Sequence, residues 1–221
     1  VLNGDVTAAG TGVITLGDAN TGITVSGSGT VGGTSTGTIT MGDVLMADGV
    51  TLTVGAGAAN QIDLDAITGT AAGAVSSLTI NSTGVVDVQE AVGTDIGTVT
   101  ITNSGGTTFN STVAAATFTL TDTADAATVS FLGNLTLSAG MTVSALGRSD
   151  AFNVSLTGTT NSIAGATTFF NTGTLTLGNG GTDATAFTGG VVATTQTGAT
   201  NGIVLNGDVT AAGTGVITLG D

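Results

Sequence analysis

Short segments in which apolar residues alternate with Thr or Ser recur along the whole chain. The clearest have a hydroxyl-bearing residue between two apolar ones, at 78–80, 99–101, 118–120, 135–137, 154–156 and 175–177. A period of two is typical of a β-strand that buries one face and exposes the other. No segment carries the period of an amphipathic helix over a comparable length. The pattern therefore predicts an all-β protein built from many short strands.

These triplets recur at nearly regular intervals. The spacing between successive members of the series runs 21, 19, 17, 19 and 21, with a mean of 19.4. Further triplets lie at 14–16, 39–41, 62–64 and 217–219, and one more strand is expected near residue 196. Gly-rich segments between the strands supply tight corners. We expect a parallel β-solenoid, a right-handed β-helix, with about ten coils of ~20 residues each over the segment 1–203.

In such a solenoid the apolar members of the triplets form one narrow core, and stacking at about 4.8 Å makes ten coils roughly 48 Å long. The alternative is two tandem β-sandwich domains of about 100 residues each. Aromatic residues make up only 3% of the chain, which disfavours a sandwich core. The residues predicted to point inward are Ile14, Leu16, Ile39, Met41, Leu52, Val54, Leu64, Leu78, Ile80, Val99, Ile101, Phe118, Leu120, Leu135, Leu137, Val154, Leu156, Leu175 and Leu177.

The two ends of the chain carry the same sequence. Segment 1–18 recurs without a change as segment 204–221, an offset of 203. The simplest interpretation is one full solenoid repeat at 1–203 followed by the start of the next identical repeat at 204–221, in a longer tandem array. The alternative is an artificial or circularly permuted sequence.

The amino-acid composition limits the metal sites and catalytic groups that the chain can form. The chain has 38 Gly and 48 Thr, no Cys, His, Trp, Tyr, Pro or Lys, and Arg148 as its one basic side chain. Thiolate or imidazole metal sites and nucleophiles activated by His are therefore excluded. Two carboxylates could still perform glycoside hydrolysis, but the residues that usually hold a sugar are missing. We expect a non-enzymatic protein without a resident cofactor.

The net charge limits which binding partners are expected. The formal net charge is −14. Nucleic acids and anionic membrane surfaces bind through Lys and Arg, so neither is expected as a partner. The uncharged segment 19–42 is filled with Gly, Ser and Thr rather than apolar residues, so no membrane insertion is expected. The expected partners are neighbouring identical repeats stacked end to end, with lateral self-association as a further contact.

The best candidate metal ligands are Asp63 and Asp65. On a strand both carboxylates would project from the outward face about 7 Å apart, where Ca²⁺ could draw them together. The alternative, which we favour, is a solvated acidic face. Asp residues that follow strands, such as Asp18 and Asp43, could form a ladder of cation sites on successive corners or could cap turns, and capping is the more common use. Segment 178–184 partly matches the Gly-Gly-x-Gly-x-Asp calcium repeat, but it occurs once.

Thr-x-Thr segments suggest another surface. They occur at 38–40, 51–53, 98–100, 117–119 and 174–176. A flat, regular array of such rows could bind ice. Because the triplet spacing varies, we expect the rows to reflect the strand preference of Thr instead.

Taken together, the period and the composition resemble those of filamentous-haemagglutinin-like adhesin stalks and related giant bacterial surface proteins. Those stalks are β-helices with coils of about this length, rich in Gly, Thr, Val, Asn and Asp. The resemblance covers the whole chain but rests on no signature motif. It implies a structural repeat of an extracellular or cell-surface fibre, stalk or filament. A calcium-binding adhesin or surface-layer-like module, and an ice-binding solenoid, are the alternatives.

Overall fold

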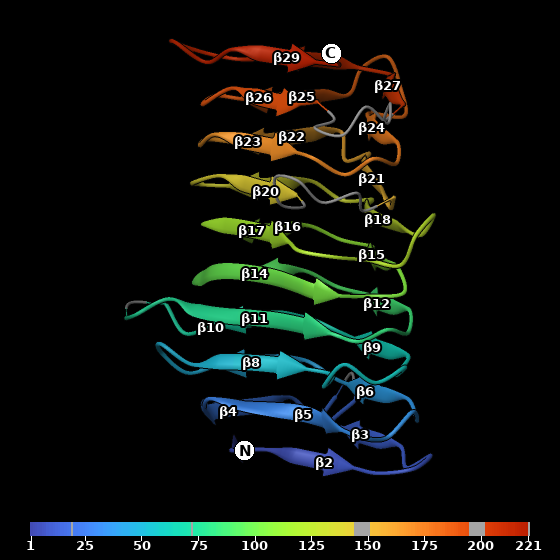
Figure 1. The fold of residues 1–221 in the computed structure, drawn as a ribbon. Coiled ribbons are helices and arrows are strands. Elements are labelled where there is room, and N and C mark those ends of the chain that lie inside the picture. The colour runs from blue at the N-terminus through green and yellow to red at the C-terminus, as the bar shows by residue number, and fades with distance from the viewer. Residues whose placement is uncertain (19, 72, 144–150, 195–201, 221) are drawn as a thin grey trace.

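In the computed structural model, the chain forms a parallel β-solenoid that advances along one axis from the N-terminus to the C-terminus (Figure 1). The structure describes residues 1–221 except 19, 72, 144–150, 195–201 and 221. Its strands form three parallel sheets of ten, ten and nine strands, here called sheets A, B and C. No described residue belongs to a helix, so none of these residues forms a helix able to cross a membrane. The predicted fold class is confirmed, and the tandem-sandwich alternative is excluded for the described chain.

The strands are short and are visited in the fixed order A, B, C. Sheet A contains β1 (Leu2–Asn3), β4 (Ile23–Gly27), β7 (Val44–Met46), β10 (Ile67–Gly69), β13 (Val92–Gly93), β16 (Val113–Ala115), β19 (Leu135–Leu137), β22 (Thr160–Ile163), β25 (Ala184–Phe187) and β28 (Asp208–Thr210). Sheet B contains β2 (Val6–Ala8), β5 (Gly29–Gly33), β8 (Thr51–Val54), β11 (Ser76–Asn81), β14 (Ile96–Asn103), β17 (Thr117–Leu120), β20 (Met141–Val143), β23 (Thr167–Phe169), β26 (Val191–Ala193) and β29 (Ile217–Leu219). Sheet C contains β3 (Ile14–Leu16), β6 (Ile39–Met41), β9 (Ile62–Leu64), β12 (Val86–Val88), β15 (Thr107–Phe109), β18 (Thr128–Phe131), β21 (Asn153–Leu156), β24 (Leu175–Leu177) and β27 (Ile203–Leu205).

The alternation along each strand produces a single apolar core enclosed by the three sheets. Every residue predicted to point inward is buried except Leu16, which is half-buried in the first coil and still packs against the core. Because strands with the same pattern stack in register, apolar residues meet apolar residues from coil to coil. Leu78, for example, lies between Leu52 and Val99 in sheet B.

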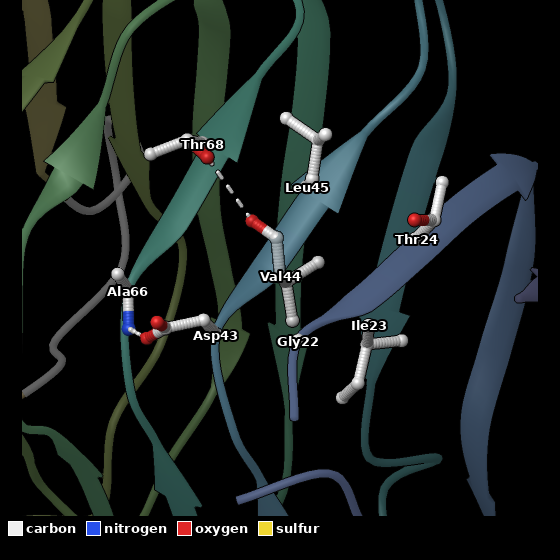
Figure 2. A pocket seen from close by; sticks show the side chains of 8 residues that line it. All are labelled: Gly22, Ile23, Thr24, Asp43, Val44, Leu45, Ala66 and Thr68. Carbon is white, nitrogen blue, oxygen red and sulfur yellow. Dashed lines mark hydrogen bonds between the residues drawn. The ribbon is translucent and has the colours of Figure 1, made fainter. Parts of the chain in front are cut away.

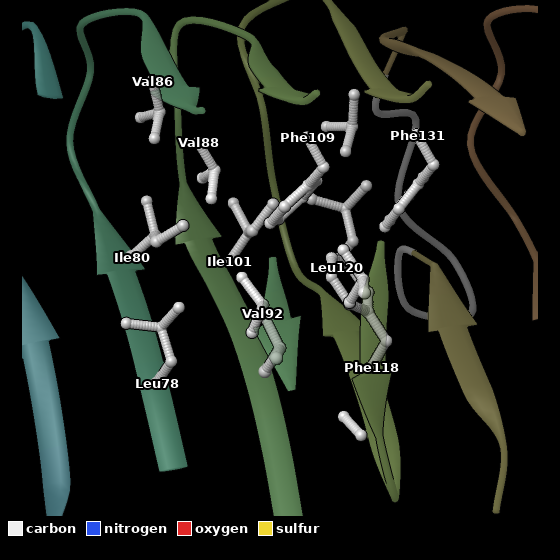
Figure 3. Close-up of a cluster of buried hydrophobic side chains, with 14 of the residues drawn as sticks. Leu78, Ile80, Val86, Val88, Val92, Ile101, Phe109, Phe118, Leu120 and Phe131 are labelled. Carbon is white, nitrogen blue, oxygen red and sulfur yellow. The ribbon is translucent and has the colours of Figure 1, made fainter. Parts of the chain in front are cut away.

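Phenylalanine fills the middle of the core. The rings of Phe109 and Phe131 stack across adjacent strands of sheet C with their centroids 5.0 Å apart. Phe118 approaches Phe131 edge-on from sheet B, also at 5.0 Å. Figure 3 shows these rings meeting aliphatic side chains from the opposite sheets. Offset-stacked and edge-to-face pairs are favourable ring geometries, so these contacts add to the stability of the core.

The predicted coil length was too short. Each coil holds three strands of similar pattern, so a triplet does not mark one coil. The intervals from 118–120 to 135–137 and from there to 154–156 span two strands each, whereas the other intervals in that series span three. Segment 1–203 contains β1–β26, which amount to eight and two-thirds coils instead of ten. The strand expected near residue 196 lies outside the described residues.

The corner that joins sheet B to sheet C carries one buried polar side chain in most coils. The members are Ser35, Asn60, Ser82, Ser104, Thr123 and Asn171. Asn60 Nδ2 donates to the Ser35 main-chain oxygen at 2.9 Å, and Ser82 Oγ donates to the Asn60 oxygen at 2.6 Å. Side-chain hydrogen bonds therefore join several pairs of successive coils along this corner. They include hydrogen bonds that a buried, irregular backbone needs.

Candidate functional site

The most regular outward surface is a column of threonines on sheet B. Its members occupy equivalent positions on seven successive strands, β5 to β23, and are paired in register. They are Thr30, Thr53, Thr79, Thr100, Thr119, Thr142 and Thr168. Val192 interrupts the column on β26, and Thr218 resumes it on β29. Parallel pairing spaces these side chains about 4.8 Å apart along the solenoid.

A second, shorter column runs beside the first. It consists of Thr51, Ser77, Thr98 and Thr117, two positions before the first column on each strand. Thr98 Oγ1 and Thr117 Oγ1 lie 3.0 Å apart and share a hydrogen bond. Within the part of the chain that the structure describes, no side-chain hydrogen bond engages the hydroxyls of the first column. We call the two columns together the threonine face.

The sequence located only part of this surface. The Thr-x-Thr segments at 51–53, 98–100 and 117–119 belong to it, whereas those at 38–40 and 174–176 lie at sheet C. Variable spacing had argued against a regular array. The strands nevertheless remain in register where successive coils differ in length, since the step from Leu78 to Val99 is longer than the step from Val99 to Phe118. The corners between strands take up the difference in coil length. The spacing of triplets along the sequence does not show this.

The two predicted calcium ligands lie on β9 and directly after its end. Asp63 lies outward in the middle of β9, while Asp65 follows the strand and its main-chain nitrogen donates to the Met41 oxygen at 3.0 Å. The acid in register with Asp63 is Asp87 on the next coil. Gln61 donates an amide hydrogen bond to Asp63 at 3.3 Å. No cluster of three or more acids suited to a metal ion occurs among the described residues.

Most other carboxylates that accept hydrogen bonds close turns or join coils. Asp18 Oδ1 accepts the Asn20 N–H at 2.9 Å within its own turn, as predicted. Asp43 Oδ1 instead accepts the Ala66 N–H of the next coil at 3.3 Å. Capping by Asp therefore serves both the turn and the stacking of coils.

The segment that partly matches a calcium repeat is organised around its own carboxylate. Asp183 is buried, and its Oδ2 accepts the N–H groups of Asn179 at 2.7 Å and Gly180 at 3.0 Å. Two main-chain donors on one oxygen stabilise a tight turn before β25. This carboxylate has a structural partner, which explains why Asp occurs at the end of the Gly-rich segment.

A shallow depression of about 380 Å³ lies on sheet A near the N-terminal end (Figure 2). Its floor and walls come from β4, β7 and β10, with Thr24, Leu45 and Thr68 among the lining residues. Two of its polar side chains bind within the fold: Asp43 accepts the Ala66 N–H, and Thr68 Oγ1 donates to the Val44 oxygen at 3.3 Å. The lining brings together one carboxylate and no second acid or base.

Comparisons with family models, with curated proteins and with solved structures returned no match. The fold is a β-solenoid, while the likeness to filamentous-haemagglutinin-like stalks rests on period and composition alone.

Proposed function

We propose that this chain is a structural repeat of an extracellular or cell-surface β-solenoid fibre, adhesin stalk or filament, and that it has no enzymatic activity. The observation that carries the proposal is the uninterrupted stacking of strands from one end of the chain to the other, combined with the return of segment 1–18 at 204–221. A chain built this way gains length with each coil, whereas a compact domain does not.

Both ends of the solenoid support stacking on further repeats. Strands β1 to β3 pair on one side only, and so do β27 to β29. Coverage differs between the two ends: Ile14 on β3 is 6% exposed, while Ile217, its counterpart on β29, is 40% exposed. An exposed parallel edge with apolar side chains beside it is a template for another coil. The partner proposed for each edge is the adjoining repeat of the same array.

The composition supports a location outside the cell. One Arg and no Lys leave few sites for trypsin-like proteases. A net charge of −14 favours repulsion between neighbouring rods and weakens as salt screens it. Lateral contact between rods is therefore expected to increase with ionic strength, and the same charge argues against nucleic acid as a partner.

The proposal is tested by electron microscopy of chains with one, three and five consecutive copies of segment 1–203. Each added copy is expected to lengthen a smooth rod by about 42 Å, from eight and two-thirds coils at about 4.8 Å. The chain 1–221 serves as the length standard. Beads joined by flexible necks, or a length that does not increase in proportion to the repeat number, would reject a continuous fibre.

A second candidate function is ice binding, and the threonine face favours it. Hydroxyl groups repeat there about 4.8 Å apart along the axis, over seven strands in the longer column and four in the shorter, and the two columns lie about 7 Å apart along each shared strand. The hydroxyls of the longer column are free of side-chain hydrogen bonds within the described chain. A rigid array of this kind can order water in its own pattern, which is what adsorption to ice requires.

Thermal hysteresis of the chain 1–221 distinguishes the two candidates. Ice binding predicts a measurable hysteresis that Thr100→Tyr abolishes, because a bulky ring in the centre of the face breaks its flatness. Thr108→Tyr, on the outward side of sheet C, is the matched control and should leave the hysteresis unchanged. Absence of hysteresis in the unmodified chain would reject ice binding and leave the structural role.

A further inference from the structure

The two identical copies of segment 1–18 lie in different sheets. In the first copy, β2 belongs to sheet B and β3 to sheet C. In the second copy, β28 carries the equivalent of β2 in sheet A, and β29 carries the equivalent of β3 in sheet B. The second copy has thus moved by one third of a coil relative to the first.

The same side chains nevertheless face the core in both copies. Ile14 is in register with Ile39 in sheet C, and its counterpart Ile217 is in register with Val191 in sheet B, both on the inward face. Thr15 and its counterpart Thr218 both lie on the outward face, in register with Thr40 and Val192. The segment fits either sheet because the three sheets share one alternation and one parallel ladder.

Coil length supports this placement. The step from Val191 to Ile217 is as long as the step from Met141 to Thr167 in the same sheet. A second copy in the same sheets as the first would instead put Val209 next to Ala193, in the column that its counterpart Val6 begins. That step would be shorter than any between paired residues of sheet B, where the shortest joins β14 to β17.

We infer that consecutive repeats of the array are rotated by one third of a coil, so that the threonine face moves from sheet B to sheet A and then to sheet C before it returns to sheet B. The inference rests on the proposed tandem array. The described strands of one repeat, β1 to β26, are not a multiple of three, and three repeats hold 26 whole coils. The array therefore has a superperiod of three repeats, about 125 Å at 4.8 Å per coil.

The rotation determines which sides of such a fibre carry the threonine face. A repeat of whole coils would return the threonine face to the same side in every repeat. The observed repeat instead shows this face on three sides in turn, each time over seven strands. A fibre of this form can contact further copies of itself in three directions through the same surface, and it presents no single flat side.

Disulfide cross-linking in the chain 1–221 tests the rotation. The chain has no cysteine, so each introduced pair reports one contact. In-register neighbours on parallel strands lie about 4.8 Å apart, within the Cα separation that a disulfide accepts. Val192→Cys with Thr218→Cys is expected to form a disulfide rapidly under mild oxidation, because these outward residues are paired in sheet B.

A second pair tests the alternative placement. If both copies occupied the same sheets, Asp208 would lie beside Val192, because its counterpart Asp5 precedes Thr30 in the same outward column. Val192→Cys with Asp208→Cys is expected not to form a disulfide, because Asp208 is in register with Ala184 in sheet A.

The first copy supplies the positive control. Thr15→Cys with Thr40→Cys joins paired outward residues of sheet C and should form its disulfide at a similar rate. A disulfide between positions 192 and 208 in place of 192 and 218 would put both copies in the same sheets and overturn the inference. Failure of both Val192 pairs while the control forms would overturn it as well.

A chain of three repeats separates this inference from the proposed function. With Thr100→Cys in every repeat and a gold label on each, the labels should lie about 42 Å apart along the rod and project from a different sheet in each of the three repeats. Labels along one side of a continuous rod would overturn the rotation and retain the fibre. Separate beads would reject the fibre itself, whatever the result of the cross-linking.

Discussion

Single residues at the corner between sheets B and C hold adjacent coils together. Ser82 Oγ donates to the Asn60 oxygen at 2.6 Å and accepts the Gly84 N–H at 3.0 Å. Each of these partners is a main-chain group that the ladders of the sheets do not use. The sequence signals the corner only as a small polar residue followed by Thr and Gly, as at 35–37 and 82–84. Burial of that polar residue follows from the stacking and is not visible in the sequence.

Ser82→Ala is expected to lower the free energy of unfolding by about 1–3 kcal/mol, since a main-chain oxygen and an N–H lose a buried partner. Urea denaturation followed by circular dichroism measures the effect. Thr83→Ala, at the exposed neighbouring position, is the control and should change stability by less than about 0.5 kcal/mol. Equal effects of the two substitutions would contradict a stabilising role for these corner hydrogen bonds.

Position 84 requires glycine because adjacent coils lie close together there, not because of its backbone angles. A Cβ atom at this position would overlap the main-chain oxygen of Asn60 in the coil before it. Gly84→Ala is therefore expected to destabilise the fold by about 1–3 kcal/mol through overpacking. Gly181→Ala, where a Cβ would meet nothing within 4 Å, should leave the urea midpoint unchanged. If Gly84→Ala were equally neutral, the coils would be packed less closely than observed.

At the scale of the strand, alternation alone decided which side chains face inward. Register with the neighbouring strands decided which outward side chains lie next to one another. It produced both the threonine face and a pair of like charges. Asp63 and Asp87 are paired on the outward side of sheet C. Asn110 and Gln89 donate amide hydrogen bonds to Asp87, which offsets part of the repulsion. The sequence shows Asp65 beside Asp63 because the two are close in the chain, whereas the register with Asp87 depends on how successive coils stack.

Asp63→Asn is expected to raise the free energy of unfolding by about 0.2–1 kcal/mol at low ionic strength, because like charges directly opposite each other destabilise a sheet. The gain should diminish at high salt, which screens charges near the surface. Asp65→Asn, beyond the end of the strand, serves as the control. A gain that does not depend on salt would point to a cause other than charge.

Calcium titration addresses the same carboxylates. We favour a solvated acidic face, so millimolar CaCl2 is expected to leave the thermal midpoint unchanged. A rise in the midpoint that Asp63→Asn or Asp65→Asn abolishes would contradict this and assign these carboxylates to Ca²⁺.

Over the whole molecule, the described strands pair only with strands of adjacent coils. Stability should therefore be distributed along the axis rather than held by one global transition. Phe118 packs on Phe109 and Phe131 near the middle of the solenoid, so it tests this arrangement.

Phe118→Ala is expected to cost about 3–5 kcal/mol locally. Hydrogen exchange should rise in the adjoining strands β11 to β20 and remain unchanged in β1 to β5, which lie several coils away. Leu45→Ala, at an exposed position on sheet A, should have little effect on exchange near Phe118. A uniform rise along the whole chain would indicate a single cooperative unit.

The all-β class, the parallel solenoid and the inward residues could be predicted from the chain alone, because they depend on a period of two among its apolar residues. The expectation of a non-enzymatic protein depends on which side chains are present. Tertiary structure decided the number of coils, the threonine face, the pairing of Asp63 with Asp87 and the sheet that each copy of segment 1–18 occupies. All four depend on register between strands that belong to different coils. Corners of variable length set that register. Because the strands are short and similar, their spacing in the sequence does not show which three of them make one coil.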